Sequence, residues 1–163
     1  MTLLVSSIVK ETKTLIKNNI QLNAIGDLKE LPDKAVEKLK EVINKTKNNS
    51  RMNLILALSY SGRWEIINAI KKITKDSINY DEINETSFKQ YLTTKNVPDP
   101  ELLIRTGGEK RISNFLLWQI AYTELYFTET LCPDFKEPDL EKAIINYQTR
   151  ERRFGKTTEQ VQK

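Results

Sequence analysis

The sequence predicts an α/β fold in which a parallel sheet is flanked by helices. Short apolar segments of strand length alternate along the chain with longer segments whose apolar residues recur at helical spacing. The segment 52–58 is an almost continuous apolar run, as expected of a strand buried on both faces of a parallel sheet. At 163 residues the chain can build one core of its own. We therefore expect one α/β domain over residues 1–155 and a loose tail over 156–163.

The individual elements are predicted from apolar spacing and from the turn residues between them. The expected helices are 2–18, 32–47 with Pro32 in its first turn, one from the turn SYSGR to about residue 75, a short one at 87–94, a buried one at 114–122 and a last one at 139–153. The expected strands are 20–25, 52–58, 101–104 and 125–128. Polar loops at 26–27, 59–63 and 105–113 each follow a strand, and ligands of such sheets gather at the carboxyl ends of strands.

Composition narrows the classes of function. The net charge is +4, and the basic residues are scattered along helices rather than gathered in one block. This distribution suits an anionic substrate or an anionic membrane surface and argues against nucleic-acid binding. The chain has no histidine, which excludes Ser-His and Cys-His catalysis, and its one cysteine, Cys132, fits a reducing cytoplasm. No apolar run approaches the length of a transmembrane segment.

The loop after the predicted strand 101–104 has the composition of a phosphate or diphosphate site. Arg105 and Arg111 offer planar guanidinium forks, Ser113 offers a hydroxyl, and the pair Gly107-Gly108 lets the backbone approach a ligand closely. A helix expected to begin near Ser113 adds unpaired N–H groups and a partial positive charge. A solvated loop closed by Arg–Glu pairs explains the same residues equally well.

Glu124 is the candidate metal ligand. It follows the predicted buried helix 114–122, on the same face as Leu117 and Ile120. A buried carboxylate there is costly unless a cation compensates it, and the negative end of the helix dipole adds to the cost. The cation is either an arginine or a divalent metal such as Mg²⁺, which prefers carboxylate oxygens and substrate phosphates. The residues alone leave both alternatives open.

Three segments of the chain carry a family resemblance. The run LLIRTGGEKRISNFLLWQIAYTELYFTETLCPDF, together with SYSGRWEI at 59–66 and ERRFG at 151–155, resembles the cis-prenyltransferases, specifically bacterial undecaprenyl diphosphate synthase (isoprenyl transferase). The resemblance covers most of the chain. It implies a Mg²⁺-dependent transferase that condenses isopentenyl diphosphate with an allylic diphosphate, such as farnesyl diphosphate, in cis. It further implies a cytoplasmic homodimer at the inner face of the membrane, which delivers its undecaprenyl product there for cell-wall synthesis.

The resemblance also assigns roles to single residues. Arg105, Arg111 and Ser113 match positions that bind the diphosphate of isopentenyl diphosphate, and Glu124 matches a Mg²⁺ ligand. Arg153 and Gly155 match the family's C-terminal RxG element, which reaches the same diphosphate, often from the partner subunit. The alternative for Arg150, Arg152 and Arg153 is that they lie at a helix C-terminus, where their positive charge complements the helix dipole. Glu109 braces an arginine or the subunit contact, or it forms a plain surface pair. Leu54, Leu56 and Leu58 line a prenyl tunnel or belong to an ordinary core.

The chain differs from the family in lacking two of the family's motifs. The family begins with a strand ending in a DGNGRWA-like motif, whose aspartate binds Mg²⁺ and promotes loss of diphosphate, and neither this motif nor the family's SxEN-W-like run occurs here. We therefore expect the larger C-terminal portion of an isoprenyl transferase, with no catalytic residue of its own and little or no activity alone. The alternatives are a non-catalytic subunit that completes the active site of a partner synthase and a generic phosphate-binding fragment. An unpaired sheet edge further predicts poor stability or obligate oligomerisation.

Overall fold

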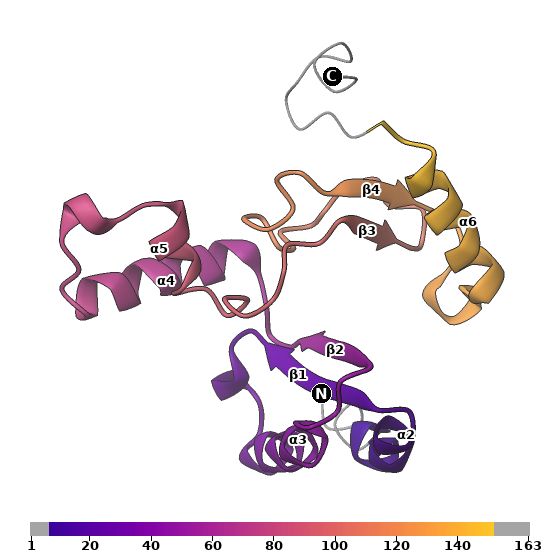
Figure 1. Cartoon of the computed structure of the whole chain (residues 1–163), viewed down its shortest axis with the longest axis horizontal. Coiled ribbons are helices and arrows are strands. Elements are labelled where there is room, and N and C mark those ends of the chain that lie inside the picture. The colour runs from indigo at the N-terminus through magenta and orange to yellow at the C-terminus, as the bar shows by residue number, and fades with distance from the viewer. Residues whose placement is uncertain (1–6, 152–163) are drawn as a thin grey trace. The chain divides into compact units, whose positions relative to one another are not determined.

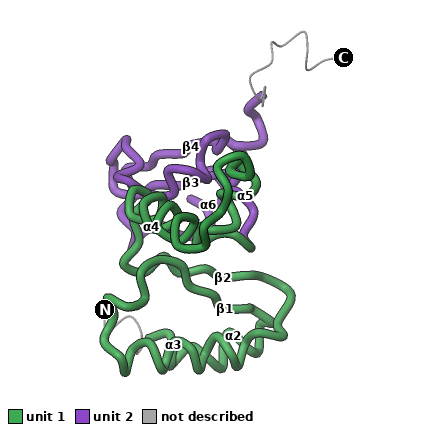
Figure 2. Tube along the Cα trace, turned by 90° about the vertical axis from the view of Figure 1, so that its left-hand side faces the viewer, with its two compact units in different colours: residues 1–96 green, residues 97–163 purple. Residues whose placement is uncertain are grey.

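Two parallel strand pairs organise the computed structural model of the protein, which describes residues 7–151 (Figure 1). The chain divides into two compact units, Met1–Asn96 and Val97–Lys163, and each unit contains one strand pair (Figure 2). Parallel strands with helices packed beside them confirm the predicted fold class. The expected single domain over 1–155 stays a prediction, because compact units of one chain need not be separate folding domains.

Unit 1 is built on the pair β1 (Ile20–Ile25) and β2 (Met52–Ala57), which run in register from Ile20 opposite Met52 to Ile25 opposite Ala57. Helices α2 (Thr12–Lys17) and α3 (Asp33–Thr46) pack against β1. The predicted helix 2–18 is helical at 7–10 and again in α2, with a turn at Glu11 between them. The buried core of this region consists of Leu15, Leu22, Leu31, Leu39, Val42 and Leu58.

Helix α3 illustrates how local sequence builds this region. Pro32 immediately precedes the helix, where its fixed φ and missing N–H are tolerated. Leu39 and Val42, three residues apart on one face, are buried against the strands. Near the end of the helix, the buried Thr46 hydroxyl donates to the Val42 carbonyl at 3.0 Å and accepts the Leu22 N–H at 3.1 Å. One hydroxyl therefore joins the end of α3 to the middle of β1.

The remainder of unit 1 contains α4 (Gly62–Lys75), the short 3₁₀ helix η2 (Tyr80–Glu82) and α5 (Glu85–Lys89). Ser61 caps α4 by accepting the Trp64 N–H, and the Tyr60 and Trp64 rings meet edge-on with centroids 6.5 Å apart. Glu65 is 1% exposed, yet its carboxylate is well satisfied. It accepts the Tyr60 hydroxyl at 2.6 Å and the Thr93 N–H at 2.9 Å, and it also accepts the Thr93 hydroxyl. These bonds hold the segment after α5 against α4.

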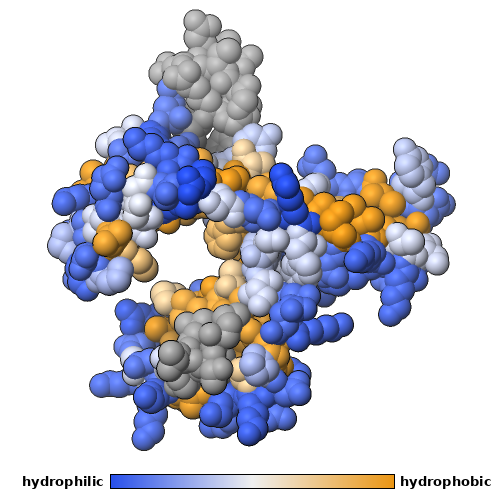
Figure 3. Space-filling model, turned by 180° about the vertical axis from the view of Figure 1, so that it is seen from behind, coloured by the Kyte–Doolittle hydropathy of each residue, from blue (hydrophilic) through white to orange (hydrophobic). Residues whose placement is uncertain are grey.

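Unit 2 is built on the pair β3 (Leu102–Arg105) and β4 (Glu124–Phe127), with Leu102 opposite Glu124 and Arg105 opposite Phe127. After β4 come the short 3₁₀ helix η3 (Cys132–Asp134) and α6 (Glu137–Gln148), and α6 packs against β4. Every residue of both strands is half-buried. Apolar side chains remain at the surface of both units (Figure 3), including Ile67 in α4 and Ile145 in α6.

The structure corrects several sequence predictions. The helix expected at 87–94 is α5, which ends at Lys89, and the helix expected at 139–153 is α6, which ends at Gln148. The apolar run 114–122 forms a series of turns and not a buried helix, since Ser113, Asn114 and Leu116 have φ of 46°, 62° and 47°, which a right-handed helix excludes. Tyr122 in this run is 71% exposed. Strand β2 is also less buried than its apolar sequence predicts. Its residues range from half-buried to exposed, because it has a partner strand on one edge only within the described part of the chain. Apolar sequence indicates burial only where another layer covers the segment.

Within residues 7–151, no helix combines the length and the apolar composition that crossing a membrane requires. The predicted tail 156–163 lies outside the described residues. The predicted oligomerisation of the chain stays a prediction.

Candidate functional site

The candidate site is the loop that leaves the carboxyl end of β3 and returns to the start of β4. Gly107 and Gly108 have φ of +84° and +76°, a conformation that glycine adopts without strain. Their N–H groups donate to the carbonyls of Thr130 and Thr128, both at 2.9 Å. The glycine pair therefore holds the loop against the segment that follows β4, and its amide groups are used within the protein.

Arg105 is the centre of the polar contacts in this loop. Its Nη1 donates to the Ser113 hydroxyl oxygen at 2.8 Å and to the Arg111 carbonyl. Since both bonds use Nη1, Nε and Nη2 of this guanidinium keep three N–H donors that have no partner within the described residues. The structure thus brings Arg105 and Ser113 together, as the sequence predicts, and adds the backbone at Arg111 to the cluster.

The Arg111 side chain behaves differently from its backbone. Its guanidinium pairs with the Glu109 carboxylate, and the two side chains are 66% and 45% exposed. Glu109 therefore braces an arginine, as one prediction has it. The pair is also exposed, so it is the surface pair of the alternative prediction as well. Such an exposed pair contributes little stability, so Arg111 can exchange Glu109 for a ligand phosphate at small cost.

Glu124 lies at the other end of the strand pair. It is the first residue of β4 and faces Leu102, whereas Arg105 faces Phe127. The two positions are three residue steps apart, or roughly 10 Å along the ladder. The Glu124 Oε2 lies 2.7 Å from Nη1 of Arg150, and the two side chains are 28% and 31% exposed. Of the two cations that the sequence allowed, the structure contains the arginine.

Arg150 is the residue of this cluster whose role the sequence analysis missed. It follows α6, and its Nε and Nη2 donate to the Asn146 Oδ1 at 3.0 and 2.7 Å. The i,i+4 spacing of Asn146 and Arg150 near the end of a helix was the available signal. The pairing with Glu124 is not visible in sequence, because it depends on how α6 packs against β4.

The residues at Glu124 fit a metal ion only in part. Within residues 7–151, no three Cys, Asp or Glu side chains come together as a metal site. Mg²⁺ commonly takes one or two carboxylates and completes its shell with water and substrate phosphates. Glu124 fits the role of one such carboxylate, provided that Arg150 releases or shares it. Arg153 and Gly155, the other predicted diphosphate contacts, lie outside the described residues.

Comparison with known proteins shows the family. The family described as "Putative undecaprenyl diphosphate synthase" matches residues 1–155. An isoprenyl transferase of Porphyromonas gingivalis is 50% identical over 165 residues, which cover 99% of this chain and 65% of that protein. A ditrans,polycis-undecaprenyl-diphosphate synthase ((2E,6E)-farnesyl-diphosphate specific) of Coxiella burnetii is 46% identical over 167 residues, covering 100% of this chain and 70% of that one.

Solved structures agree with the sequence comparison. Lavandulyl diphosphate synthase from Lavandula x intermedia, in complex with dimethylallyl diphosphate, superposes with a TM-score of 0.84 at 40% identity, over 93% of this chain and 66% of that one. A probable undecaprenyl diphosphate synthase from Campylobacter jejuni gives 0.82 at 41% identity, over 94% and 72%.

By class, the chain therefore belongs to the prenyltransferase family of proteins. More particularly, it belongs to the undecaprenyl diphosphate synthase family, as its sequence motifs predicted. It spans about two thirds of the length of the curated relatives it matches, namely 65% and 70% of the two named above.

Proposed function

We propose that this chain carries the isopentenyl diphosphate site of a cis-prenyltransferase that extends an allylic diphosphate such as farnesyl diphosphate toward an undecaprenyl product. The observation that carries the proposal is the hydrogen bond between Arg105 and Ser113, which holds a guanidinium and a hydroxyl side by side at the carboxyl end of β3. Parallel sheets bind their ligands at such strand ends. The family membership of the chain supports the same assignment.

In this proposal Arg105, Ser113 and Arg111 bind or orient the diphosphate. Nε and Nη2 of Arg105 donate to phosphate oxygens, while its Nη1 stays on Ser113 and keeps the guanidinium plane fixed. The Ser113 hydroxyl accepts from Arg105 and has its own proton left to donate to the ligand. Arg111 leaves Glu109 and adds a second positive charge. The bound diphosphate is thereby neutralised and its five-carbon group is aligned for reaction.

Glu124 is the residue that we propose to hold Mg²⁺. Because it lies at the other end of the strand pair from Arg105, the ion bridges Glu124 to a diphosphate that extends from Arg105 toward it. Mg²⁺, when bound, supplies charge neutralisation of phosphate oxygens. Arg150 competes for the same carboxylate, so its release is part of forming the complete site. Arg153 and Gly155 contribute the C-terminal contact to the diphosphate, within a homodimer that works in the cytoplasm at the inner face of the membrane.

The test uses the full chain in two measurements. Calorimetric titration compares isopentenyl diphosphate with ATP and inorganic diphosphate, and we expect isopentenyl diphosphate to bind most tightly. Preference for ATP or inorganic diphosphate would instead indicate a generic phosphate site. Prenyl transfer from farnesyl diphosphate with Mg²⁺ is expected to be close to zero for this chain alone, and robust turnover would refute that part of the proposal.

A second assay separates the enzyme from the non-catalytic subunit. The chain is mixed with a full-length synthase of the family, and prenyl transfer and co-purification are measured. If the chain binds the synthase and raises its turnover, it acts by completing a partner's active site. If it binds isopentenyl diphosphate but no synthase, the subunit hypothesis is wrong.

A further inference from the structure

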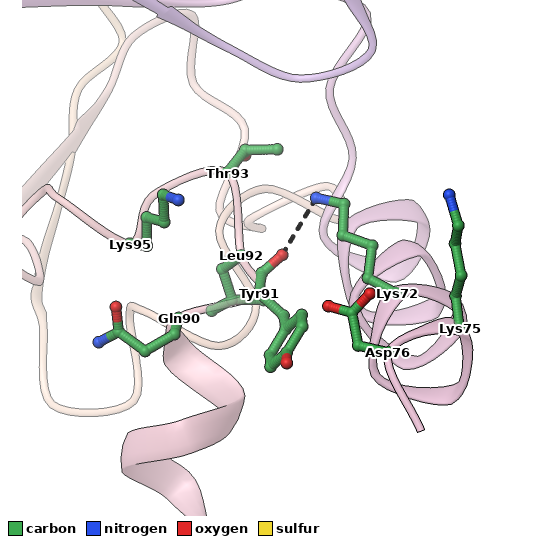
Figure 4. Close-up of a pocket in the computed structure, with 8 residues that line it drawn as sticks. All are labelled: Lys72, Lys75, Asp76, Gln90, Tyr91, Leu92, Thr93 and Lys95. Carbon is green, nitrogen blue, oxygen red and sulfur yellow. Dashed lines mark hydrogen bonds between the residues drawn. The ribbon is translucent and has the colours of Figure 1, made fainter. Parts of the chain in front are cut away.

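A second concentration of positive charge lies in unit 1, outside the candidate diphosphate loop. A cavity of about 540 Å³ opens between the last turns of α4 and the segment that follows α5. Lys72 and Lys75 line it from α4, and Lys95 lines it from the other segment. Figure 4 shows Lys72 and Lys75 projecting in the same direction from the helix, and Lys95 on the far side of the Tyr91 backbone.

The charges of this cavity do not balance. Three ammonium groups line it against one carboxylate, that of Asp76. Lys72 donates to the Tyr91 carbonyl at 3.2 Å, which leaves two of its three N–H groups. Within residues 7–151, neither Lys75 nor Lys95 makes an ion pair or a hydrogen bond through its side chain. The cavity therefore has an excess of two positive charges and many unused donors.

The Asp76 carboxylate is engaged by a neutral neighbour. Desolvation of the Tyr91 hydroxyl and the adjacent Asp76 carboxylate raise the pKa of Tyr91, so the phenol keeps its proton at neutral pH. The Tyr91 hydroxyl therefore adds no negative charge to the cavity, and Asp76 is its one carboxylate against three lysines. The tyrosine ring adds an apolar wall to the same cavity.

The wall formed by the segment after α5 is fixed in place before any ligand binds. Leu92 is 2% exposed and anchors the segment to the interior. Thr93 is held through its N–H and its hydroxyl by the buried Glu65 carboxylate of α4. The segment after α5 is thus joined to α4 by hydrogen bonds within the protein, and a ligand need not order it.

We propose that this cavity binds a phosphate group carried by an organic phosphate, at a site independent of the loop 105–113. Lysine is a compact point charge suited to phosphate, and the net excess of two positive charges in the cavity matches the charge of a phosphomonoester dianion. The volume exceeds that of a bare phosphate and falls in the range of small-molecule sites, so the organic part can lie against Tyr91. The phosphate belongs either to a soluble ligand or to the headgroup of an anionic lipid.

The test is a titration of the full chain at low salt with hexyl phosphate as the soluble probe. Arg105→Ala serves as the background, so that binding at the candidate diphosphate loop does not contribute. In that background, K75Q/K95Q should weaken binding about tenfold, about threefold for each solvent-exposed ammonium removed. The matched control is K38Q/K71Q, which removes the same charge from exposed lysines outside the cavity and should change binding less than about twofold.

A second arm separates the two sources of phosphate. Cosedimentation is measured with vesicles of phosphatidylcholine alone and with added phosphatidic acid, with the same variants. Binding of hexyl phosphate alone identifies a soluble ligand, and binding of phosphatidic acid vesicles alone identifies a lipid headgroup; either supports the cavity if K75Q/K95Q weakens it selectively. An equal loss in both double variants, or no binding of any probe, overturns the proposal. Circular dichroism checks that each variant is folded.

Discussion

The two strand pairs of this protein differ in what covers them. The pair β1–β2 has helices α2 and α3 against it and a continuous buried core, in which Leu22 is 1% exposed and Leu39 0%. The pair β3–β4 has α6 beside it, but all its strand residues are only half-buried. In the described part of unit 2, Gln119 and Ala143 are the buried residues. The same parallel ladder is therefore supported by apolar packing in one unit and largely by polar contacts in the other.

This difference has a consequence for the candidate site. The loop between β3 and β4 is held by hydrogen bonds from Gly107, from Gly108 and from Arg105, and by the Thr123 hydroxyl, which donates to the Pro100 carbonyl at 2.6 Å. A net hydrogen bond contributes about 1 kcal/mol, whereas a buried leucine contributes several times more. Unit 1 should thus tolerate little change in its core, and unit 2 should tolerate more change with less loss of stability.

The largest expected difference is between two leucines. Leu39→Ala removes a fully buried side chain from the core of unit 1 and should lower the free energy of unfolding by about 3 to 4 kcal/mol, from lost burial and from the cavity left behind. Leu125→Ala removes a half-buried side chain of β4 and should cost about 1 kcal/mol. Urea denaturation of both variants measures the difference. Equal losses would mean that unit 2 has a core comparable with that of unit 1.

The next comparison uses two glycines. Gly26 has φ of +108°, and a Cβ on it would lie 2.0 Å from the Leu58 carbonyl oxygen, so Gly26→Ala forces the ends of β1 and β2 apart. We expect a loss of about 3 kcal/mol, because a backbone atom must move. Gly107 has φ of +84°, but its Cβ would meet nothing closer than 4.0 Å, so Gly107→Ala should cost only about 1 kcal/mol of conformational strain.

Thermal unfolding of the two glycine variants at one protein concentration gives the measurement. A larger loss for Gly107→Ala than for Gly26→Ala would show that backbone strain in the candidate loop outweighs a direct clash. Unit 2 would then tolerate less change than unit 1, the reverse of what their packing predicts.

Substitutions at Arg105 and Ser113 should weaken ligand binding although they change the stability of the protein little. Arg105→Ala should weaken isopentenyl diphosphate binding about 30-fold, since a charged fork to phosphate is lost, and Arg105→Lys should weaken it about tenfold because charge remains but the fork does not. Ser113→Ala should cost about threefold. Arg51→Ala, an exposed arginine before β2, is the matched control and should leave binding unchanged. Calorimetry of the four variants tests the order, and an effect of Arg51→Ala as large as that of Arg105→Ala would exclude a local site.

The smallest expected effect on stability concerns Arg150. Arg150→Gln removes the partner of Glu124 and should lower the free energy of unfolding by about 0.5 to 1 kcal/mol, since both side chains are partly solvated. The same change should strengthen the dependence of isopentenyl diphosphate binding on Mg²⁺, because the carboxylate is released. Glu124→Gln should abolish that dependence. If Mg²⁺ acts equally in wild type and both variants, Glu124 does not bind the metal.

Apolar spacing predicted the helices and strands of unit 1 well, because these elements pack their apolar faces on one core. The helix 32–47 and the strand 20–25 were expected within one residue of α3 and β1, because each presents an apolar face to the common core. The run 114–122 was expected as a buried helix for its apolar residues and forms turns instead. The sequence of this run does not indicate whether another helix or strand covers it. The fold class and the family motifs were therefore predictable, whereas the burial of this run was not.

Within the candidate site, the residues that are close in sequence could be predicted to lie together, and those far apart could not. Arg105 and Ser113 are eight residues apart, at the two ends of one short segment, so their proximity was expected from the sequence, whereas their hydrogen bond is seen only in the structure. Glu124 and Arg150 are 26 residues apart, and their pairing depends on the packing of α6 against β4. Sequence reasoning expected a cation beside Glu124 because it placed the carboxylate after a buried helix, and it could not choose between arginine and a metal. The structure has no such helix at 114–122, yet it does place an arginine beside Glu124.

The placement of the tryptophans gives each unit its own fluorescence signal. In unit 1 the Tyr60 ring meets the Trp64 ring edge-on. The chain has two tryptophans, Trp64 in unit 1 and Trp118 in unit 2. Trp64 follows the cap of α4 and lies one residue before Glu65, whose carboxylate holds Thr93 at the lysine-lined cavity. With Trp118 replaced by phenylalanine, the remaining indole emission reports on the surroundings of α4. With Trp64 replaced instead, it reports on the β3–β4 loop, so the two units can be followed separately in one intact chain.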